Sequence, residues 1–306
     1  TINVIRSWLA FLLIVNYMVV IFTPFGVHAM TFYEAEGVIG DWRGIVSHKN
    51  AAGAITAFTI LFFLFDRGRL PNALTGVVLL ASVFFLLMTN SKSSIAMLAV
   101  SATAGGLMYW YNPRHRTMVI PIAMILAVGL ASLTVIYLGA IQNILDDPGA
   151  FTGRAQIWPL LFHFAGENLW TGAGYMSFWQ IGEKCPIWEL TNGWVASTQG
   201  HGHNGYHDIL VTLGLPGLAL TIAVIFIWPA IKLLFSTDIS RTRRSLVVSL
   251  MVFALGHNMM ESTLLDRASA VNVFLMVAII LVHRLSSQSA GAHHMIRHRL
   301  VHLVQR

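Results

Sequence analysis

Long apolar stretches, separated by short polar segments, run along most of the chain. A helix needs roughly 20 mostly apolar residues to cross the hydrocarbon core of a bilayer. The candidate spans are about residues 4–23, 48–65, 71–89, 93–111, 118–141, 216–235, 246–264 and 270–284. The pattern therefore predicts an all-α, polytopic transmembrane bundle of about eight spans, which we treat as a single membrane domain over residues 1–306. The polar connection 142–204, rich in Gly and Trp, is expected to be a large extracytoplasmic loop that carries part of a functional site.

Composition agrees with a membrane protein, since 56% of residues are hydrophobic and only 10% are charged. A soluble domain has about 25% charged residues. The single cysteine, Cys185, excludes an intrachain disulfide and a four-cysteine metal site. The chain starts at Thr1 and shows no signal-peptide pattern, so we expect one or more N-terminal helices of the original gene product to be missing.

The distribution of Lys and Arg predicts the orientation of the spans. If the N-terminus is cytoplasmic, thirteen of the nineteen Lys and Arg residues lie inside, as the positive-inside rule requires. Residues 24–47 and 142–204 are then outside, and residues 66–70, 112–117, 236–245 and the tail are inside. Topology thus accounts for the net charge of +6, and nucleic acid is excluded as a partner.

The remaining cations oppose this charge bias and lie on the outer face. They are Arg43, Lys49, Lys92, Arg154, Lys184 and Arg267. Cations from separate segments that converge at one membrane surface are typical of an anionic substrate, with phosphate or diphosphate as the obvious class. The alternative is that each cation pairs with a neighbouring acid or a lipid headgroup.

A histidine cluster, "HGHNGYHD" (201–208), falls on the same outer face. His203 and His207 would share one face of a helix, and Asp208 could be a third metal ligand. However, Gly202 and Gly205 make the approach flexible, and no His-Glu-x-x-His pattern is present. The cluster is therefore read as a catalytic or substrate-orienting histidine, as a structural group bonded to loop carbonyls, or, least favoured, as a metal site.

The residues that follow the histidine cluster favour an ordered functional site. Residues 205–213 suit a short helix, "GLPG" breaks it, and Pro216 is well placed to open the true span. His203 would then lie near a helix N-terminus, where N–H donors and partial positive charge favour anions and a neutral imidazole.

Several motifs resemble the O-antigen ligase and polymerase superfamily. They are "HN" followed by "GLPG" (203–204 and 214–217), "TNSKSS" (89–94), "GRAQIW" (153–158), "LWTGAGYMSFW" (169–179) and, for the exopolysaccharide-polymerase branch, "WRGIVSHKNAAG" (42–53). The motifs occur in the family's order, and the resemblance covers about residues 40 to 265. The family usually has more spans, which agrees with an incomplete N-terminus. It also usually has arginine where this chain has Lys92, and lysine loses the bidentate fork.

The resemblance implies an enzyme of the bacterial cytoplasmic (inner) membrane whose active site faces the periplasm. It would transfer or polymerise an undecaprenyl-diphosphate-linked glycan onto a sugar acceptor, with no metal or other cofactor and with membrane lipid around it. Further partners are expected in a polysaccharide export assembly. Carried over by position, His203 and Arg154 are catalytic. Diphosphate-binding residues are Arg43, Lys49, Lys92 and Arg154, and supporting residues are Asn204, His207 and Asp208.

Other classes of protein remain alternatives. A ligase would share this chemistry and differ in its acceptor. A polysaccharide or lipid transporter would predict symmetry between halves and ionisable groups deep in the bilayer, where only His257 is found near mid-span. A scaffold or an intramembrane protease has no motif in its favour. The tryptophans of the outer loop suit either sugar stacking or a position at the membrane interface; these are Trp158, Trp170, Trp179, Trp188 and Trp194.

Overall fold

The computed structural model describes residues 2–29, 36–66, 68, 70–115, 117–118, 154–179, 185–191, 194–198, 200–236 and 239–286. Within these residues the regular structure is helical, apart from one antiparallel bridge between Val27 and Trp42. The all-α class is thereby confirmed for the described part. Almost all of the predicted span 118–141, and residues 142–153 of the predicted outer loop, lie outside the described residues.

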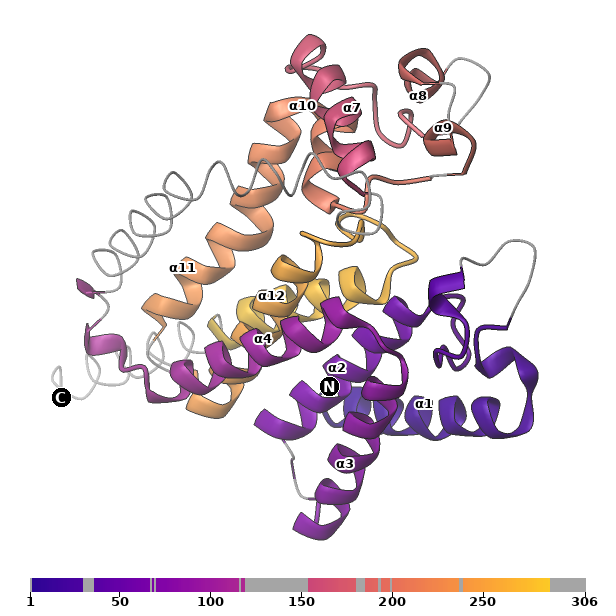
Figure 1. The fold of residues 1–306 in the computed structure, drawn as a ribbon. Helices are drawn as coiled ribbons and strands as arrows, with labels where there is room; N and C mark the ends of the chain where they lie inside the picture. Colours follow the sequence, from indigo (N-terminus) through magenta and orange to yellow (C-terminus); the bar gives the residue numbers. More distant parts are fainter. Residues whose placement is uncertain are drawn as a thin grey trace, which may run out of the picture. The chain divides into compact units, whose positions relative to one another are not determined.

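Helices occupy the other predicted spans (Figure 1). They are α1 (Ile2–Phe22), α2 (Lys49–Phe65), α3 (Asn72–Met88), α4 (Lys92–Trp110), α10 (Gly205–Ile222) continued through a π-turn (Ala223–Ile227) into α11 (Trp228–Phe235), α12 (Arg241–His257) and the helix Ala270–Ser286. By length and composition two of the described helices can cross a membrane, namely Ile2–Phe22 and Gly205–Phe235. The total of about eight spans stays a prediction.

Shorter helices fill the connections. They are the 3-10 turns η1 (Pro24–Gly26), η2 (Glu36–Val38) and η3 (Pro113–His115), and the helices α7 (Arg154–Glu167), α8 (Pro186–Leu190) and α9 (Trp194–Thr198). The chain forms two compact units, each described by itself. The first comprises Thr1–Tyr111, Ser236–His257 and Leu265–Arg306, and the second comprises Asn112–Phe235 and Asn258–Leu264. The prediction of one membrane domain over residues 1–306 stays a prediction.

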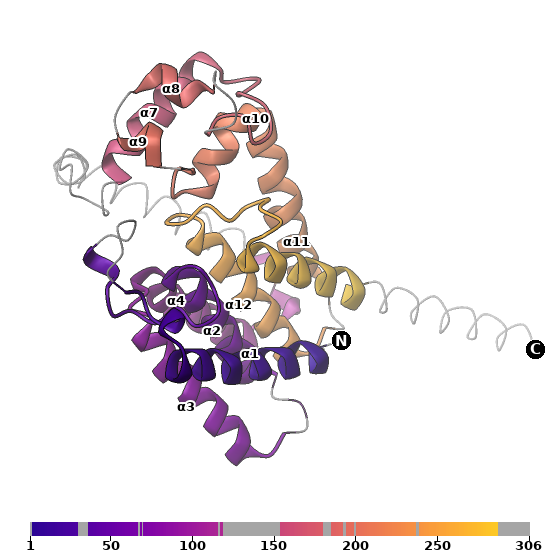
Figure 2. The same ribbon diagram turned by 90° about the vertical axis from the view of Figure 1, so that its right-hand side faces the viewer.

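In the first unit, α12 packs along α4 and α2 (Figures 1 and 2). Aromatic rings fill the centre: Phe58 lies 4.8 Å from Phe253 and 4.5 Å from Phe274, measured between ring centroids. Gly105 lets the helices approach, because a Cβ there would fall 2.0 Å from the Oγ of Ser249. Small residues at helix contacts are common where helices associate within lipid.

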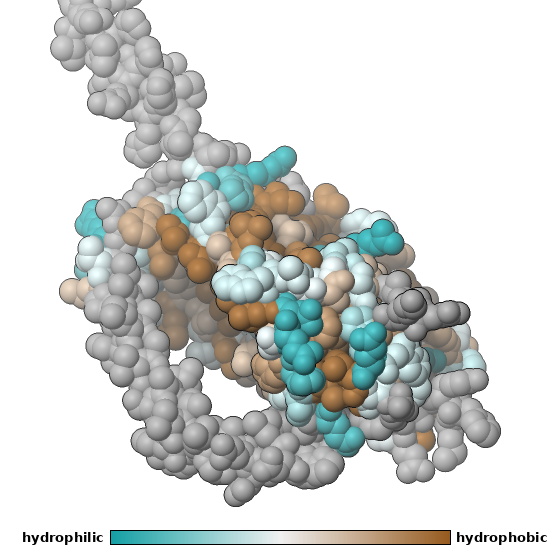
Figure 3. Space-filling view, turned by 90° about the horizontal axis from the view of Figure 1, so that it is seen from above, coloured by the Kyte–Doolittle hydropathy of each residue, from teal (hydrophilic) through white to brown (hydrophobic). Residues whose placement is uncertain are grey.

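Helix α1 buries two polar side chains among its inward-facing leucines and exposes apolar side chains to its surroundings. Arg6 and Asn16 are buried, and the Arg6 guanidinium pairs with Asp66 at 2.6 Å. Phe11 and Met18, in contrast, are more than half exposed. Apolar side chains also reach the surface elsewhere in the described residues, as the brown areas of Figure 3 show. Exposed apolar side chains on a helix that is long enough to cross a membrane support a lipid environment for α1.

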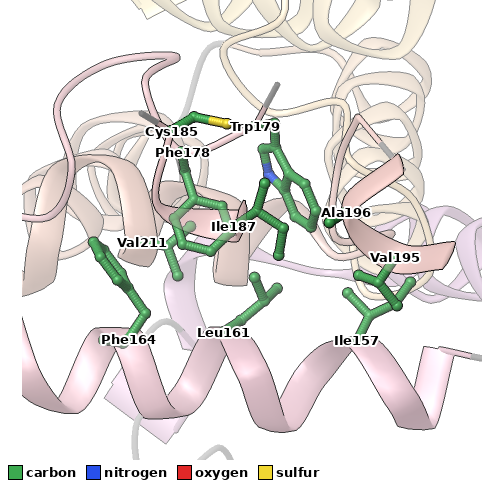
Figure 4. Close-up of a cluster of buried hydrophobic side chains, with 11 residues drawn as sticks. Ile157, Leu161, Phe164, Phe178, Trp179, Cys185, Ile187, Val195, Ala196 and Val211 are labelled. Carbon is green, nitrogen blue, oxygen red and sulfur yellow. The ribbon is translucent and has the colours of Figure 1, made fainter. Parts of the chain in front are cut away.

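The second unit has its own apolar core (Figure 4). One face of α7, carrying Ile157, Leu161 and Phe164, packs against loop and helix residues. The residues on the other side are Phe178, Trp179, Cys185, Ile187, Val195, Ala196 and Val211. This core fixes the start of α7 and the start of α10 in one unit, which is where the predicted catalytic residues lie.

Helix α10 breaks at Gly214, as the "GLPG" motif predicts. Gly214 has φ 66° and ψ −174°, a conformation that is essentially restricted to glycine. The helix carbonyls freed before the break, those of Val211 and Thr212, accept hydrogen bonds of 2.8 Å from the N–H groups of Ala173 and Gly174. After the break, Leu215 N–H donates to the carbonyl of Leu169 at 2.7 Å. The Gly-x-Gly segment and the "GLPG" motif therefore meet through main-chain atoms, and we call this contact the main-chain junction.

Candidate functional site

The site is built around the N-terminus of α10, where Asn204 is the N-cap. Its Oδ1 accepts hydrogen bonds from the N–H groups of Tyr206 (3.0 Å) and His207 (3.2 Å). Its Nδ2 donates to the carbonyl of Met259 at 3.3 Å, and its own N–H donates to Ser262 Oγ at 3.0 Å. Asn204 therefore joins the start of α10 to a segment more than fifty residues later in the chain.

That segment, residues 258–264, was predicted to be the outer end of a membrane helix, and this prediction is wrong. Helix α12 ends at His257, and residues 258–264 are non-helical. The physical reason is the fully buried Asn258, whose Oδ1 accepts hydrogen bonds of 2.9 Å from Thr263 N–H, Thr263 Oγ1 and Leu264 N–H. An asparagine that satisfies nearby backbone donors in this way competes with helix formation.

A carboxylate from the 258–264 segment lies between the two residues that were predicted to be catalytic. Glu261 Oε1 is 2.8 Å from Nη2 of Arg154, and Glu261 Oε2 is 3.7 Å from Nδ1 of His203. The side chain of Glu261 is 12% exposed, that of Arg154 is 15% exposed and that of His203 is 26% exposed, so all three are partly shielded from water. His203 has φ 51°, a left-handed conformation that is uncommon for a residue other than glycine. Arg154 and His203 thus belong to one site.

The two other histidines of the cluster have different surroundings. The ring of His201 lies 4.2 Å from that of His203, and its Nδ1 accepts the His203 N–H at 3.3 Å. Burial of the His201 ring is the main cause that lowers its pKa, and charge repulsion from His203 lowers this pKa further. His207 lies edge-on to Phe162 and Trp158. In the part of the chain that the structure describes, no group of three or more His, Cys, Asp or Glu side chains is arranged to hold a metal ion.

Asp208 shapes the loop that leads to His203. Its carboxylate accepts the Gly202 N–H at 3.0 Å and the indole N–H of Trp179 at 2.9 Å. From the other side, the Trp158 indole donates to the Gly202 carbonyl at 3.0 Å. Gly202 has little room for a side chain, because a Cβ would meet Leu161 at 2.6 Å. Asp208 therefore contributes to the site through the loop backbone.

The tryptophans of the outer loop divide between core and surface. Trp179 is buried and Trp158 is half-buried, whereas Trp170 (70% exposed) and Trp188 (41% exposed) lie at the surface. Trp194 begins α9. Trp158 and Trp179 are thus parts of the loop structure, and Trp170 and Trp188 are available to an external ligand.

The other predicted diphosphate ligands lie in the first unit. Lys49 Nζ is 2.5 Å from Asp41 Oδ2. Arg43 donates to the Phe25 carbonyl at 2.8 Å, with its guanidinium 4.5 Å from the centre of the Phe25 ring. Lys92 is exposed at the start of α4. Lys49 and Arg43 therefore have structural contacts within their unit, and whether Arg43, Lys49 and Lys92 bind diphosphate stays a prediction.

Sequence reasoning missed Glu261. In the printed sequence it stands four residues after His257 in "HNMMESTLL", within a range that reads as membrane helix. The signal that could have found it is this acidic residue inside an apolar run, since an ionisable group at membrane depth is costly and points to a function.

The described fold and site are those of a helical protein with membrane-capable segments and a cluster of Arg, His and Glu at one helix N-terminus. Residues 76–222 match a family model described as O-antigen ligase. The matched range contains the "TNSKSS", "GRAQIW", Gly-x-Gly and "HN"–"GLPG" motifs, and the resemblance to the O-antigen ligase and polymerase superfamily is confirmed. No curated protein matches the chain. The family supports a membrane enzyme of glycosyltransferase type that acts on lipid-linked glycans.

Proposed function

We propose that this protein transfers or polymerises an undecaprenyl-diphosphate-linked oligosaccharide at the outer face of the bacterial cytoplasmic membrane, without a metal. The observation that carries the proposal is the joint placement of Arg154 and His203 on one carboxylate, Glu261. A cation suited to a diphosphate and an imidazole suited to a proton transfer then lie within one partly desolvated site. Such a site strengthens electrostatic stabilisation of a developing charge.

In the proposed reaction, His203 takes the proton of the acceptor hydroxyl as the oxygen attacks the anomeric carbon of the donor sugar. A new glycosidic C–O bond forms, and the C–O bond between the anomeric carbon and the diphosphate breaks. The electron pair of the broken bond remains on undecaprenyl diphosphate, whose developing charge Arg154 stabilises. The imidazole then returns its proton to solvent.

Among enzymes of this type, we favour a polymerase of exopolysaccharide repeat units. The support is the segment "WRGIVSHKNAAG" (42–53), which resembles the exopolysaccharide branch and lies outside the range matched by the family model. In the structure this segment is ordered by the contacts of Arg43 and Lys49 with Phe25 and Asp41. A ligase that passes the same donor to another acceptor is the second candidate, and its product would carry glycan on that acceptor.

The experiment is complementation of a strain that lacks the native gene, with polymer amount and length as the readout and membrane protein levels checked for each variant. Removing a general base typically costs about 10²–10⁴ in rate, so His203→Ala should still bind lipid-linked donor but make almost no polymer. Arg154→Ala should also lose donor binding, and Arg154→Lys should restore only part of it because the guanidinium fork is gone.

Matched controls come from the same unit. His163 pairs with Glu167 at 3.7 Å on an exposed helix face, and His163→Ala should leave polymer unchanged. His201→Ala and His207→Ala should have milder effects than His203→Ala. Wild-type polymer from His203→Ala at normal membrane levels would refute the proposed mechanism.

A further inference from the structure

We infer that Glu261 is a positioning residue, which orients the imidazole of His203 and the guanidinium of Arg154 for the transfer step. The inference rests on the proposed function, and it assigns a role to a residue outside both the family-matched range and the motifs of the sequence. Glu261 itself need not touch the substrate, because it acts through its two neighbours.

The carboxylate has one oxygen for each partner. Oε1 pairs with Nη2 of Arg154 at 2.8 Å, which is a charge-assisted hydrogen-bond distance. Oε2 faces Nδ1 of His203 at 3.7 Å, which is longer than a hydrogen bond. Catalytic hydrogen bonds are often long before substrate binds and shorten in the productive complex.

The placement determines which imidazole nitrogen is available. A carboxylate opposite Nδ1 favours the tautomer with its proton on Nδ1, and Nε2 then has a free lone pair to accept a proton. The same negative charge stabilises the imidazolium once it forms. A general base oriented by a second residue in this way loses much of its activity when the second residue is neutralised.

The main chain holds Glu261 at this place. Its carbonyl accepts the N–H of Gly205, the first residue of α10, at 3.2 Å. The next residue, Ser262, accepts the Asn204 N–H through its Oγ at 3.0 Å. Gly205 is needed for this approach, because a Cβ would fall 2.3 Å from Asn258 Oδ1. Side chain and backbone therefore place the carboxylate relative to His203 with little freedom.

The same contact leaves Arg154 able to bind an anion. A guanidinium has five N–H donors, and Glu261 engages Nη2. The thioether of Met260 lies 3.8 Å from Nη1 and is only a weak acceptor. Among the described residues, Glu261 therefore holds one side of the guanidinium, and the N–H groups on its other side can donate to diphosphate oxygens.

The test is the isosteric variant Glu261→Gln in purified, membrane-reconstituted protein, with rates measured against donor concentration. We expect kcat to fall about ten- to a hundred-fold, a part of the 10²–10⁴ that a general base contributes, and KM for the donor to rise.

Glu167→Gln is the matched control, because it removes a Glu–His pair of the same 3.7 Å separation on the exposed end of α7. It should leave both kcat and KM unchanged. Glu261→Asp keeps the charge on a shorter side chain, and it should lower kcat less than Glu261→Gln does. A wild-type kcat and a wild-type KM in Glu261→Gln would overturn the inference. If that variant does not accumulate, a wild-type kcat in Glu261→Asp would overturn it equally.

A measurement without turnover separates this inference from the proposed function. The ¹⁵N shifts of the His203 ring, assigned by comparison with His203→Gln, report its tautomer in the purified protein. Glu261→Gln should lower the share of the Nδ1–H form, whereas Glu167→Gln should not. If the wild-type protein transfers no glycan but the tautomer responds in this way, the proposed function fails and the positioning stands. If transfer needs His203 but neither tautomer nor kinetics respond to Glu261→Gln, the positioning fails alone.

Discussion

The backbone N–H of Asn204 donates a 3.0 Å hydrogen bond to the Oγ of Ser262. Together with the bonds from Asn204 Nδ2 to Met259 and from Gly205 N–H to Glu261, this contact joins the His-Asn motif to the non-helical residues after α12, where Glu261 lies 3.7 Å from His203. The motif is therefore completed by a segment that follows it by more than fifty residues. Asn204 has two separable tasks, capping α10 with its Oδ1 and holding the 258–264 segment with its Nδ2 and N–H.

The two tasks of Asn204 predict a graded loss of stability. Asn204→Asp keeps the acceptor for the helix N–H groups but loses the Nδ2 donor to Met259, which costs about 1 kcal/mol. Asn204→Ala also loses the cap, typically about 1 kcal/mol more. Thermal unfolding in detergent should rank wild type above Asn204→Asp and Asn204→Ala lowest. Equal stability of the two variants would show that the side chain of Asn204 does not act as the N-cap.

The break in α10 predicts a strong intolerance at Gly214. An alanine there would adopt a conformation that is essentially restricted to glycine, at about 1–3 kcal/mol, and its Cβ would lie 2.7 Å from the carbonyl carbon of Trp170. The Gly214→Ala variant should therefore unfold at a lower temperature than the wild type, and less of it should accumulate in the membrane. Gly166 in α7 is the control, since nothing lies within 4 Å of an added Cβ. Gly166→Ala should leave stability unchanged or raise it by up to about 1 kcal/mol. If Gly166→Ala were less stable than Gly214→Ala, the glycine-dependent break in α10 would be contradicted.

The predicted topology can be tested by labelling single cysteines with an impermeant maleimide in intact cells. The background is Cys185→Ser, because Cys185 is the one cysteine of the chain and is buried. His115→Cys lies in the predicted inside segment and should be labelled after permeabilisation alone. Glu189→Cys lies in the predicted outer loop and should react directly. Both positions are exposed, so failure to react is not explained by burial. Direct labelling at position 115 would contradict the orientation.

We predict that activity is independent of bound zinc. His207 faces Trp158 and Phe162, and the described residues contain no metal-binding group of three His, Cys, Asp or Glu side chains. Treatment with a chelator should leave polymer synthesis intact, and elemental analysis of purified protein should find no stoichiometric zinc. Stoichiometric zinc that disappears in the double variant His203→Ala, His207→Ala would establish a metal site instead.

Much of the fold follows from local pattern, which is why the sequence predicts it. Long apolar runs in the sequence place α1, α2, α3 and α4, and the glycine that permits φ 66° marks the break in α10. The outer end of the 246–264 range could not be predicted in the same way. Whether Asn258 continues a helix or ends it depends on its partners Thr263 and Leu264, and on the approach of Gly205.

The candidate site shows the same division. His203, Arg154 and Asn204 carry motifs with fixed spacing, so the sequence indicates them. Glu261 becomes part of the site only through a long-range contact, and no local pattern records such a contact. Lys49 has the charge expected of a diphosphate ligand, yet its pairing with Asp41 depends on the fold of the 41–49 turn.

The main-chain junction between the Gly-x-Gly segment and α10 provides a built-in reporter of this region. The amide protons of Ala173 and Gly174 are held by carbonyls before the break, and that of Leu215 is held by a carbonyl from the opposite side. Amides that open in one cooperative event share one opening free energy. The three amides should therefore show the same protection from deuterium exchange. An equal rise in protection of all three on substrate binding would reveal ordering of α10 near its break without any measurement of turnover.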